Sequence, residues 1–176
     1  TEEGRQFQIL RPLQVDYVMS MPRGAALVYP KDAGTIVHYA DIFPGAVVVE
    51  AGAGSGALSM ALLDAVGERG RLISVERREE FAQIARDNVD LWFGAPHPAW
   101  DLRVNDLADE LNAMPASSVD RVVLDMLAPW ENLDAVAHAL VPGGVLCCYI
   151  ATVTQMSRLI EDLRSSENFT DPVAWE

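Results

Sequence analysis

The strongest constraint on the fold is an alternation of short β-branched runs with amphipathic stretches along the chain. A parallel sheet covered by helices on both faces produces this pattern, because each strand needs a crossover helix to reach its parallel neighbour. The 176 residues, half of them apolar, suffice for one sizeable core. We therefore predict one α/β domain with a Rossmann-like, doubly wound, mostly parallel sheet. The predicted strands are residues 46–51, 71–76, 101–104, 119–125 and 145–151.

The segments before and after these strands predict further elements. Helices are expected at residues 13–21 and 31–42, each followed by a proline, and at residues 152–164 after the last strand. Residues 169–175 predict the beginning of a sixth strand. Since that strand is incomplete and the chain starts at Thr1, we expect truncated C-terminal strands and a piece of a longer protein. The predicted division is a helical lead-in at residues 1–44 and a ligand-binding domain at residues 45–176.

A glycine-rich turn joins the first predicted strand to the helix after it. The sequence from Glu50 to Gly56 is Glu-Ala-Gly-Ala-Gly-Ser-Gly. Glycines there allow a tight turn and a close approach of the backbone to a ligand, while free N–H groups at the helix start attract an anionic group. The alternative is that the glycines only allow the backbone to turn tightly and that the turn binds no ligand. The strand-turn-helix context favours a ligand site.

Two classes of ligand fit this turn. Gly52, Gly54 and Ala57 satisfy the dinucleotide pattern, and Glu76 lies where a ribose-binding acid belongs, so a nicotinamide-binding oxidoreductase stays open. The additional Gly56 and the acid Glu50 resemble the first motif of class I methyltransferases, which use S-adenosylmethionine. In that case Glu50 meets the cationic amino acid part of the cofactor, directly or through water.

Three further carboxylates follow successive predicted strands, at the ligand-binding edge of such a sheet. Glu76 can accept hydrogen bonds from both ribose hydroxyls, and Asp106 can accept one from the adenine amino group. Asp125 leaves an apolar strand and precedes Pro129 and Trp130, so it would lie beside the methyl donor and face the substrate. The alternative for each acid is a helix cap or a solvated surface position.

Four segments together resemble the tRNA (adenine-58-N1)-methyltransferase family in its single-subunit bacterial and archaeal form. They are Tyr-Pro-Lys-Asp at residues 29–32, the glycine turn, Asp-Met-Leu-Ala-Pro-Trp at residues 125–130 and Thr-Val-Thr-Gln at residues 152–155. The resemblance implies methyl transfer from S-adenosylmethionine to N1 of an adenine in the tRNA T-loop, with S-adenosylhomocysteine as product. It also implies assembly as a homotetramer. A cytoplasmic location is expected separately, because the sequence shows neither an apolar run that suits a membrane span nor a charged-then-apolar leader.

The resemblance also assigns site residues. Asp125 is expected to be catalytic, because an ionised carboxylate accepting from the exocyclic amino group would hold the adenine for attack. Tyr29 and Tyr149 are expected to wall the pocket for a flipped base, and Arg23 and Lys31 to meet phosphate. The alternative for Tyr149 is a place in the core. The expected cofactor-binding residues are Glu50, Gly52, Gly54, Ser55, Gly56, Leu58, Glu76, Arg77, Asp106, Leu107 and Asp125.

Composition limits the partners. The net charge is −13, with +1 up to Lys31 and −14 beyond it, so a polyanion is better received at the N-terminal edge. The three histidines lack ligand spacing and no apolar run suits a membrane span, so neither a metal nor a membrane is expected. Cys147 and Cys148 are neighbours on a predicted strand and should point to opposite faces. A methyltransferase with another substrate, or a silent binding subunit, stays open beside the tRNA enzyme.

Overall fold

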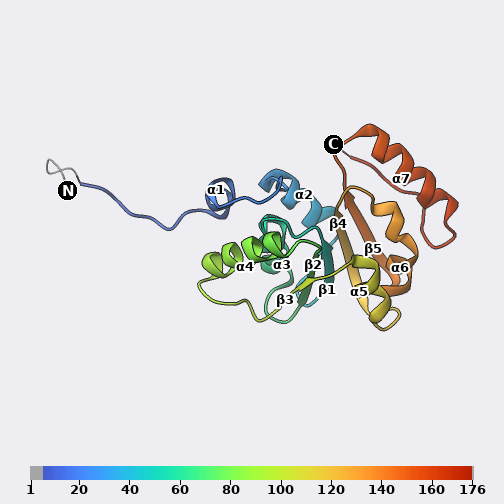
Figure 1. Cartoon of the computed structure of the whole chain (residues 1–176), viewed down its shortest axis with the longest axis horizontal. Coiled ribbons are helices and arrows are strands. Elements are labelled where there is room, and N and C mark those ends of the chain that lie inside the picture. Colours follow the sequence, from blue (N-terminus) through green and yellow to red (C-terminus); the bar gives the residue numbers. More distant parts are fainter. Residues whose placement is uncertain (1–5, 176) are drawn as a thin grey trace.

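The computed structural model describes residues 6–175, which form one five-stranded sheet with helices on both faces (Figure 1). The strand order is β3-β2-β1-β4-β5, and every neighbouring pair is parallel. The order reverses between β1 and β4, and open α/β sheets bind ligands at the carboxyl ends of the strands at such a point. The strands are β1 (Val47–Ala51), β2 (Arg71–Glu76), β3 (Trp100–Val104), β4 (Val119–Asp125) and β5 (Leu140–Tyr149).

Helices connect the strands, and two helices precede the sheet. Prolines mark their limits: Pro22 follows the first helix, and Pro30 occupies the first position of the second, where its missing N–H costs nothing. None of the helices in residues 6–175 has the length and apolarity that a membrane span requires. The helices are α1 (Gln14–Ser20), α2 (Pro30–Tyr39), α3 (Ala57–Val66), α4 (Glu79–Phe93), α5 (Leu107–Ala113), α6 (Leu133–Ala139) and α7 (Val153–Ser165), with a 3-10 turn η2 (Pro129–Asn132).

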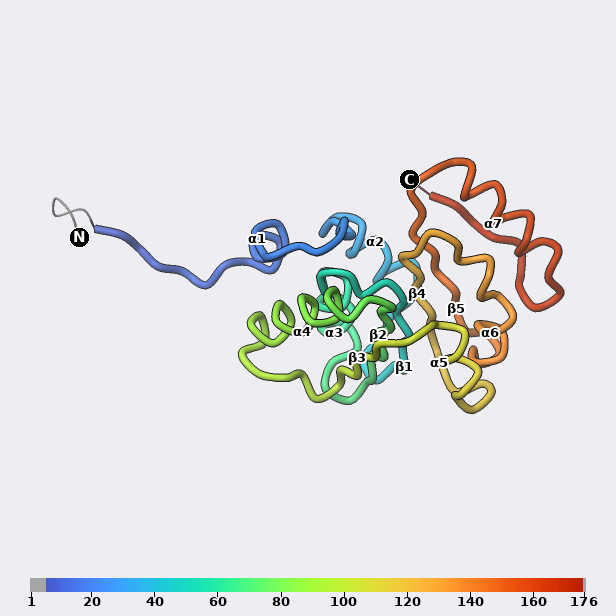
Figure 2. The backbone as a smooth tube through the Cα atoms, in the orientation of Figure 1, coloured from blue at the N-terminus to red at the C-terminus, as the bar shows by residue number. Residues whose placement is uncertain are grey.

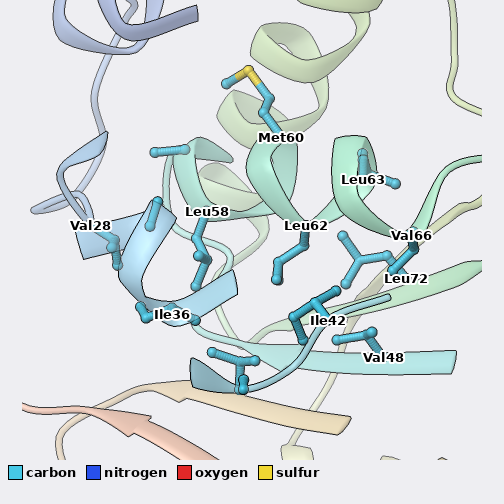
Figure 3. Packing of buried hydrophobic residues seen from close by; sticks show 14 of the residues in the cluster. Val28, Ile36, Ile42, Val48, Leu58, Met60, Leu62, Leu63, Val66 and Leu72 are labelled. Atoms are coloured by element: carbon cyan, nitrogen blue, oxygen red, sulfur yellow. The ribbon is translucent and has the colours of Figure 1, made fainter. Parts of the chain in front are cut away.

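One face of the sheet packs against α1 to α4. Alternate strand residues such as Val48 and Leu72 contribute to this core, because side chains alternate between the two faces of a strand. Figure 3 shows Leu58 and Leu62 of α3 and Ile36 of α2 gathered over these strands. The cluster anchors the helices that precede the sheet to the same face that carries the glycine turn.

The opposite face packs against α5 and α6. Val49 and Ile73 face this side, together with Leu111 of α5 and Val136 of α6. Helix α7 forms a smaller cluster with α6 and β5. At the other end of the molecule, residues 6–13 extend away from the packed layers (Figure 2). The sequence therefore predicted the layers and the existence of all five strands correctly.

Cys147 and Cys148 lie on opposite faces, as predicted. Cys147 belongs to the core under α3, whereas Cys148 packs in the core under α5 and α6. Both cysteines are free.

The last predicted strand was placed too late. Strand β5 starts at Leu140 and ends at Tyr149, so Ile150 and Ala151 lie outside it. Residues 141–144 lie opposite Asp120 as an irregularity in the ladder. Gly143 adopts a φ of +80° there, and the edge position of β5 tolerates the missing N–H of Pro142.

The predicted sixth strand is wrong, because residues 169–175 form no strand. Pro172 removes one ladder donor, and the segment is held by its side chains instead. Phe169 packs against the cores on the α5–α6 side, and the ring of Trp175 stacks on Tyr39 with centroids 4.5 Å apart. Arg164 and Asp171 add an ion pair, with 2.7 Å between Nε and Oδ1.

Candidate active site

The glycine turn brings the end of β1 against the end of β4. Gly52 has a φ of +87°, and a Cβ there would lie 2.0 Å from the carbonyl oxygen of Asp125. A side chain at Gly56, where φ is +81°, would lie 2.9 Å from Cγ2 of Val89 in α4. Only glycine satisfies the backbone angle and the close approach at both positions. The two contacts fix the turn between β4 and α4.

A buried amide in α4 ties the turn to the chain before the sheet. The side-chain nitrogen of Asn88 donates to the carbonyl oxygens of Pro22 and Ser55, at 2.9 Å each, and Asn88 is 2% exposed. The backbone N–H of Gly24 donates to Oγ of Ser55 over 3.3 Å. The sequence analysis missed Asn88. Its signal is an amide four residues after Ile84, within the apolar stripe of the helix.

Glu50 is fully buried on the face that α3 covers. It is the register partner of Ser74 on β2, and its Oε2 accepts hydrogen bonds from Ser74 at 2.6 Å and from Ser59 of α3 at 2.7 Å. Its Oε1 is buried without a partner. Burial raises the pKa of Glu50 to about 7, the two serine hydroxyls act against this rise, and the charges of Asp125 and Glu76 add to it.

Glu76 ends β2 on the same face and is 4% exposed. One carboxylate oxygen accepts from the backbone N–H of Gly54 at 3.1 Å. The other accepts from the backbone N–H of Arg78 at 3.1 Å and from its Nε at 3.2 Å. Glu76 therefore joins the glycine turn to the end of β2. A carboxylate has about four acceptor sites, so it can still accept from a ligand hydroxyl.

Asp125 ends β4 beside Tyr149, its register partner on β5. They lie two residues after Val123 and Cys147 of the core under α3, so alternation places them on the same face as Glu50 and Glu76. Burial raises the pKa of Asp125 to about 6, and the charge of Glu76 adds to the rise. The ends of three neighbouring strands thus bring three predicted carboxylates to one face of the sheet edge.

Asp106 and Arg77 follow β3 and β2 and face each other. Oδ1 of Asp106 accepts from the backbone N–H of Ala108 at 2.9 Å, so Asp106 caps α5. Its Oδ2 lies 3.4 Å from a guanidinium nitrogen of Arg77. The cap that we had weighed as the alternative for Asp106 is thus present. Leu107, also predicted to bind cofactor, is buried in the core on the α5–α6 side.

The predicted substrate residues lie on α2, on β5 and before α2. The hydroxyl of Tyr149 donates to Oδ2 of Asp32 at 3.0 Å, and burial, followed by this bond, raises the pKa of Tyr149 to about 12. Tyr149 is only partly buried, beside the core, and Tyr29, the N-cap residue of α2, is 47% exposed. The sequence analysis gave Asp32 no role, although it closes the Tyr-Pro-Lys-Asp segment.

The two predicted phosphate-binding cations already have protein partners. Nζ of Lys31 lies 2.5 Å from Oδ1 of Asp32, and the guanidinium of Arg23 donates to the carbonyl oxygen of Met19. The Lys31 ammonium is the main cause that lowers the pKa of Asp32, followed by its bond to Tyr149. Both contacts are exposed, so exchange for a phosphate costs little.

A small pocket opens where the glycine turn meets the chain before α2. Its lining includes the site residues Gly52, Gly54, Ser55, Leu58 and Asp125, and residues 26–28 form the facing wall. A larger hollow between η2, α6 and α7 contains none of the predicted site residues. The part of the chain that the structure describes shows no cluster of three or more side chains arranged to hold a metal. The small pocket therefore carries the candidate chemistry.

Comparisons with known protein families and sequences identify the family of the chain. A model of the family described as tRNA methyltransferase complex GCD14 subunit matches residues 7–176. The chain is 34% identical over 160 residues to tRNA (adenine(58)-N(1))-methyltransferase TrmI of Thermus thermophilus, covering 91% of this chain and 61% of that protein. It is 31% identical over 198 residues to tRNA (adenine(57)-N(1)/adenine(58)-N(1))-methyltransferase TrmI of Methanocaldococcus jannaschii, covering 100% of this chain and 70% of that protein.

Solved structures share the fold. The tRNA (m1A58) methyltransferase TrmI of Aquifex aeolicus matches with a TM-score of 0.80 and 25% identity, over 88% of this chain and 60% of that one. A SAM-dependent O-methyltransferase of Thermotoga maritima matches with a TM-score of 0.79 and 31% identity, over 88% of this chain and 56% of that one. The fold is therefore the Rossmann-like fold of class I methyltransferases, as predicted. The chain spans 61% of the length of the Thermus thermophilus relative.

Proposed function

Because the chain belongs to the tRNA methyltransferase complex GCD14 subunit family, we propose that it transfers a methyl group from S-adenosylmethionine to N1 of adenine 58 in the T-loop of tRNA. The observation that carries the proposal is Asp125, a partly buried carboxylate that borders the glycine-turn pocket and is paired in register with Tyr149. This pair combines an acceptor for an amino group with an aromatic ring at one sheet edge.

The residues around the turn fit S-adenosylmethionine. The partnerless Oε1 of Glu50 supplies an acceptor for the ammonium group, directly or through water. Glu76 has acceptor sites left for the ribose hydroxyls, and Gly52 lines the small pocket beside Asp125. Ser55, Gly56 and Leu58 shape the turn, while Arg77, Asp106 and Leu107 would line the adenine side by their position after β2 and β3.

S-adenosylmethionine supplies, when bound, an electrophilic methyl group on a positively charged sulfur. The N1 atom of adenine has its own lone pair, so the protein needs no strong general base. Asp125 would instead accept a hydrogen bond from the exocyclic amino group, hold the ring in line and favour the positive charge that the ring acquires. Only the ionised form of Asp125 provides both effects.

The acceptor base must leave the tRNA stack to reach Asp125. We propose that Tyr29 and Tyr149 form the walls of its pocket, and that Arg23 and Lys31 meet phosphates near by. The bond from Tyr149 to Asp32 supports this, because it holds the ring of Tyr149 between β5 and α2. Arg23, Tyr29 and Lys31 belong to the less acidic N-terminal stretch that ends at Lys31, whereas Tyr149 lies on β5.

We further propose that the enzyme acts in the cytoplasm as a homotetramer. Three large apolar residues before α1, Phe7, Ile9 and Leu10, are at least three-quarters exposed, which favours burial against another copy. Assembly would also gather the less acidic N-terminal stretches of several copies around one tRNA. Native mass spectrometry should show the tetramer, and a monomer that methylates tRNA at full rate would contradict it.

The decisive experiment is incubation with S-adenosylmethionine and unmodified tRNA, followed by nucleoside analysis. We expect 1-methyladenosine at position 58. A tRNA with guanine at that position serves as the control and should stay unmethylated. Methylation at another position or on another molecule would replace the substrate part of the proposal. Tight binding of NAD, without binding of S-adenosylhomocysteine, would restore the oxidoreductase that the turn alone left open.

A further inference from the structure

A chain of hydrogen bonds reaches Glu50 from the edge of the sheet. Nε1–H of Trp100 on β3 donates to Oγ of Ser74 on β2 at 2.9 Å, and the Ser74 hydroxyl donates to Oε2 of Glu50 on β1 at 2.6 Å. Ser59 of α3 donates to the same oxygen at 2.7 Å. Ser59 and Ser74 are fully buried, so water does not compete for these bonds. Three strands and one helix thus converge on one carboxylate oxygen.

The direction of the chain follows from its donors. An indole nitrogen can only donate, and a serine hydroxyl carries a single proton. Because Trp100 occupies an acceptor site of Ser74, the proton of Ser74 points to Glu50 rather than away from it. The arrangement therefore supplies two donors to Oε2 and leaves Oε1 without any.

The surroundings of Glu50 otherwise oppose its charge. Burial favours the neutral form, and the carboxylates of Asp125 on β4 and Glu76 on β2 add repulsion. Arg78 neutralises part of the charge of Glu76 through its ion pair at 3.2 Å. The hydroxyls of Ser59 and Ser74 are the groups that lower the pKa of Glu50. Without them, the carboxyl would hold its proton to higher pH.

We propose that Ser74, Ser59 and Trp100 are positioning residues that keep Glu50 ionised and reserve its Oε1 for the ammonium group of S-adenosylmethionine. The inference rests on the cofactor part of the proposed function and is independent of the tRNA substrate. A neutral Glu50 would present an acidic proton, or a weaker acceptor, to a cation. Loss of a donor should therefore weaken cofactor binding where Glu50 becomes neutral, and not where it stays ionised.

The test is titration calorimetry of S-adenosylmethionine and S-adenosylhomocysteine between about pH 6 and about pH 9. The variants are Ser74→Ala, Ser59→Ala and Trp100→Phe, with Trp92→Phe, which lies outside the chain of bonds, as the matched control. Each Kd is divided by the wild-type Kd at the same pH, which cancels the titration of the cofactor's own amino group. If the pKa of Glu50 rises by one unit, the ratio should be about 10 below the wild-type pKa and close to 1 at the highest pH.

Ser59→Ala should give a ratio of similar size, and Trp100→Phe a smaller one, because it removes a donor only to Ser74. The ratio for Trp92→Phe should stay near 1 throughout. When Ser74→Ala is made in a Glu50→Gln background and its Kd is divided by that of Glu50→Gln, the ratio should not depend on pH, since no carboxyl is left to titrate at position 50. If Ser74→Ala does not fold, Ser59→Ala and Trp100→Phe decide the matter alone.

A ratio that is raised equally at every pH would mean that these residues only support the fold, and it would overturn the inference. Failure of the wild-type chain to bind either cofactor form would overturn both the inference and the cofactor assignment. Cofactor binding with the expected pH pattern, but no methylation of tRNA, would leave the inference intact and refute the proposed substrate.

Discussion

Replacement of Gly52 by alanine tests the packing that the candidate site depends on. A Cβ at this position would lie 2.0 Å from the carbonyl oxygen of Asp125, and backbone atoms on both sides of the contact belong to strand ends. No flexible side chain can move aside to relieve it. The end of β4 must therefore shift, and the carboxylate of Asp125 shifts with it.

The cost has two parts. A non-glycine residue in the left-handed region costs roughly 1 kcal/mol, and forcing extra volume into a packed site costs about 1–3 kcal/mol. Together they amount to about 2–4 kcal/mol, which lowers the Tm of a domain of this size by roughly 4–16 °C. Gly94→Ala is the matched control, because its φ of +79° resembles the +87° of Gly52 but nothing lies within 4 Å of its Cβ. It should lose only about 2–4 °C.

Thermal unfolding and calorimetric titration with S-adenosylhomocysteine measure the two consequences. Gly52→Ala should unfold below Gly94→Ala and bind S-adenosylhomocysteine at least about tenfold more weakly than wild type, because a displacement near 1 Å disturbs a positioned site strongly. Gly94→Ala should bind like wild type. Equal Tm values and equal affinities for the two variants would refute the role assigned to the Gly52–Asp125 contact.

Three further variants address charge and buried bonds. Since the pKa of Glu50 is raised from 4.5 to about 7 in the folded chain, its ionisation lowers the free energy of unfolding as pH rises through that interval. The free energy of unfolding of Glu50→Gln should therefore rise, relative to wild type, by up to about 3 kcal/mol between about pH 5 and about pH 8. A Tm difference that is constant with pH would contradict this. Because the pKa of Asp125 is raised to about 6, wild-type turnover should increase as pH rises through about 6. Asp125→Asn should lower kcat by about 100-fold or more while changing Kd for the cofactor only a few-fold. Equal losses in kcat and in cofactor affinity would refute a catalytic role. Asn88→Ala leaves the carbonyls of Pro22 and Ser55 without their donor, which should cost about 2 kcal/mol and lower Tm by roughly 4–8 °C in an unfolding scan. A Tm equal to that of wild type would show that the bonds are dispensable.

The sequence was sufficient for the parallel layers because local patterns determine them. Residues 71–76 and 119–125 were predicted with their observed limits, since β-branched runs there begin after Gly70 and Ser118 and close on the acids Glu76 and Asp125. The sequence was insufficient to predict strand pairing at the edge of the sheet. Whether residues 169–175 pair with β5 depends on neighbouring backbone, and side-chain contacts such as Trp175 on Tyr39 compete with pairing. Composition carries no information about that competition.

The candidate site likewise contains residues that the sequence predicted and residues that it missed. Glu50, Glu76 and Asp125 were predictable because each lies at or next to the carboxyl end of a parallel strand, and the topology brings such ends to one edge. Asn88 and Asp32 were missed because their roles depend on contacts with segments 66 and 117 residues away along the chain. A polar residue in an apolar helical stripe was the only local sign of Asn88. Asp32 gave none beyond its place in the Tyr-Pro-Lys-Asp segment.

The charge of the site bears on the choice that the glycine turn alone left open. Glu50, Glu76 and Asp125 lie on one face at neighbouring strand ends, and their mutual repulsion contributes to the raised pKa of Glu50 and Asp125. A ligand that carries positive charge relieves this repulsion when it binds, whereas a pyrophosphate adds to it. S-adenosylmethionine bears a sulfonium and an ammonium group against a single carboxylate. The free-energy cost of gathering three acids at one edge is therefore offset by a cationic cofactor and increased by a dinucleotide, which favours the methyltransferase.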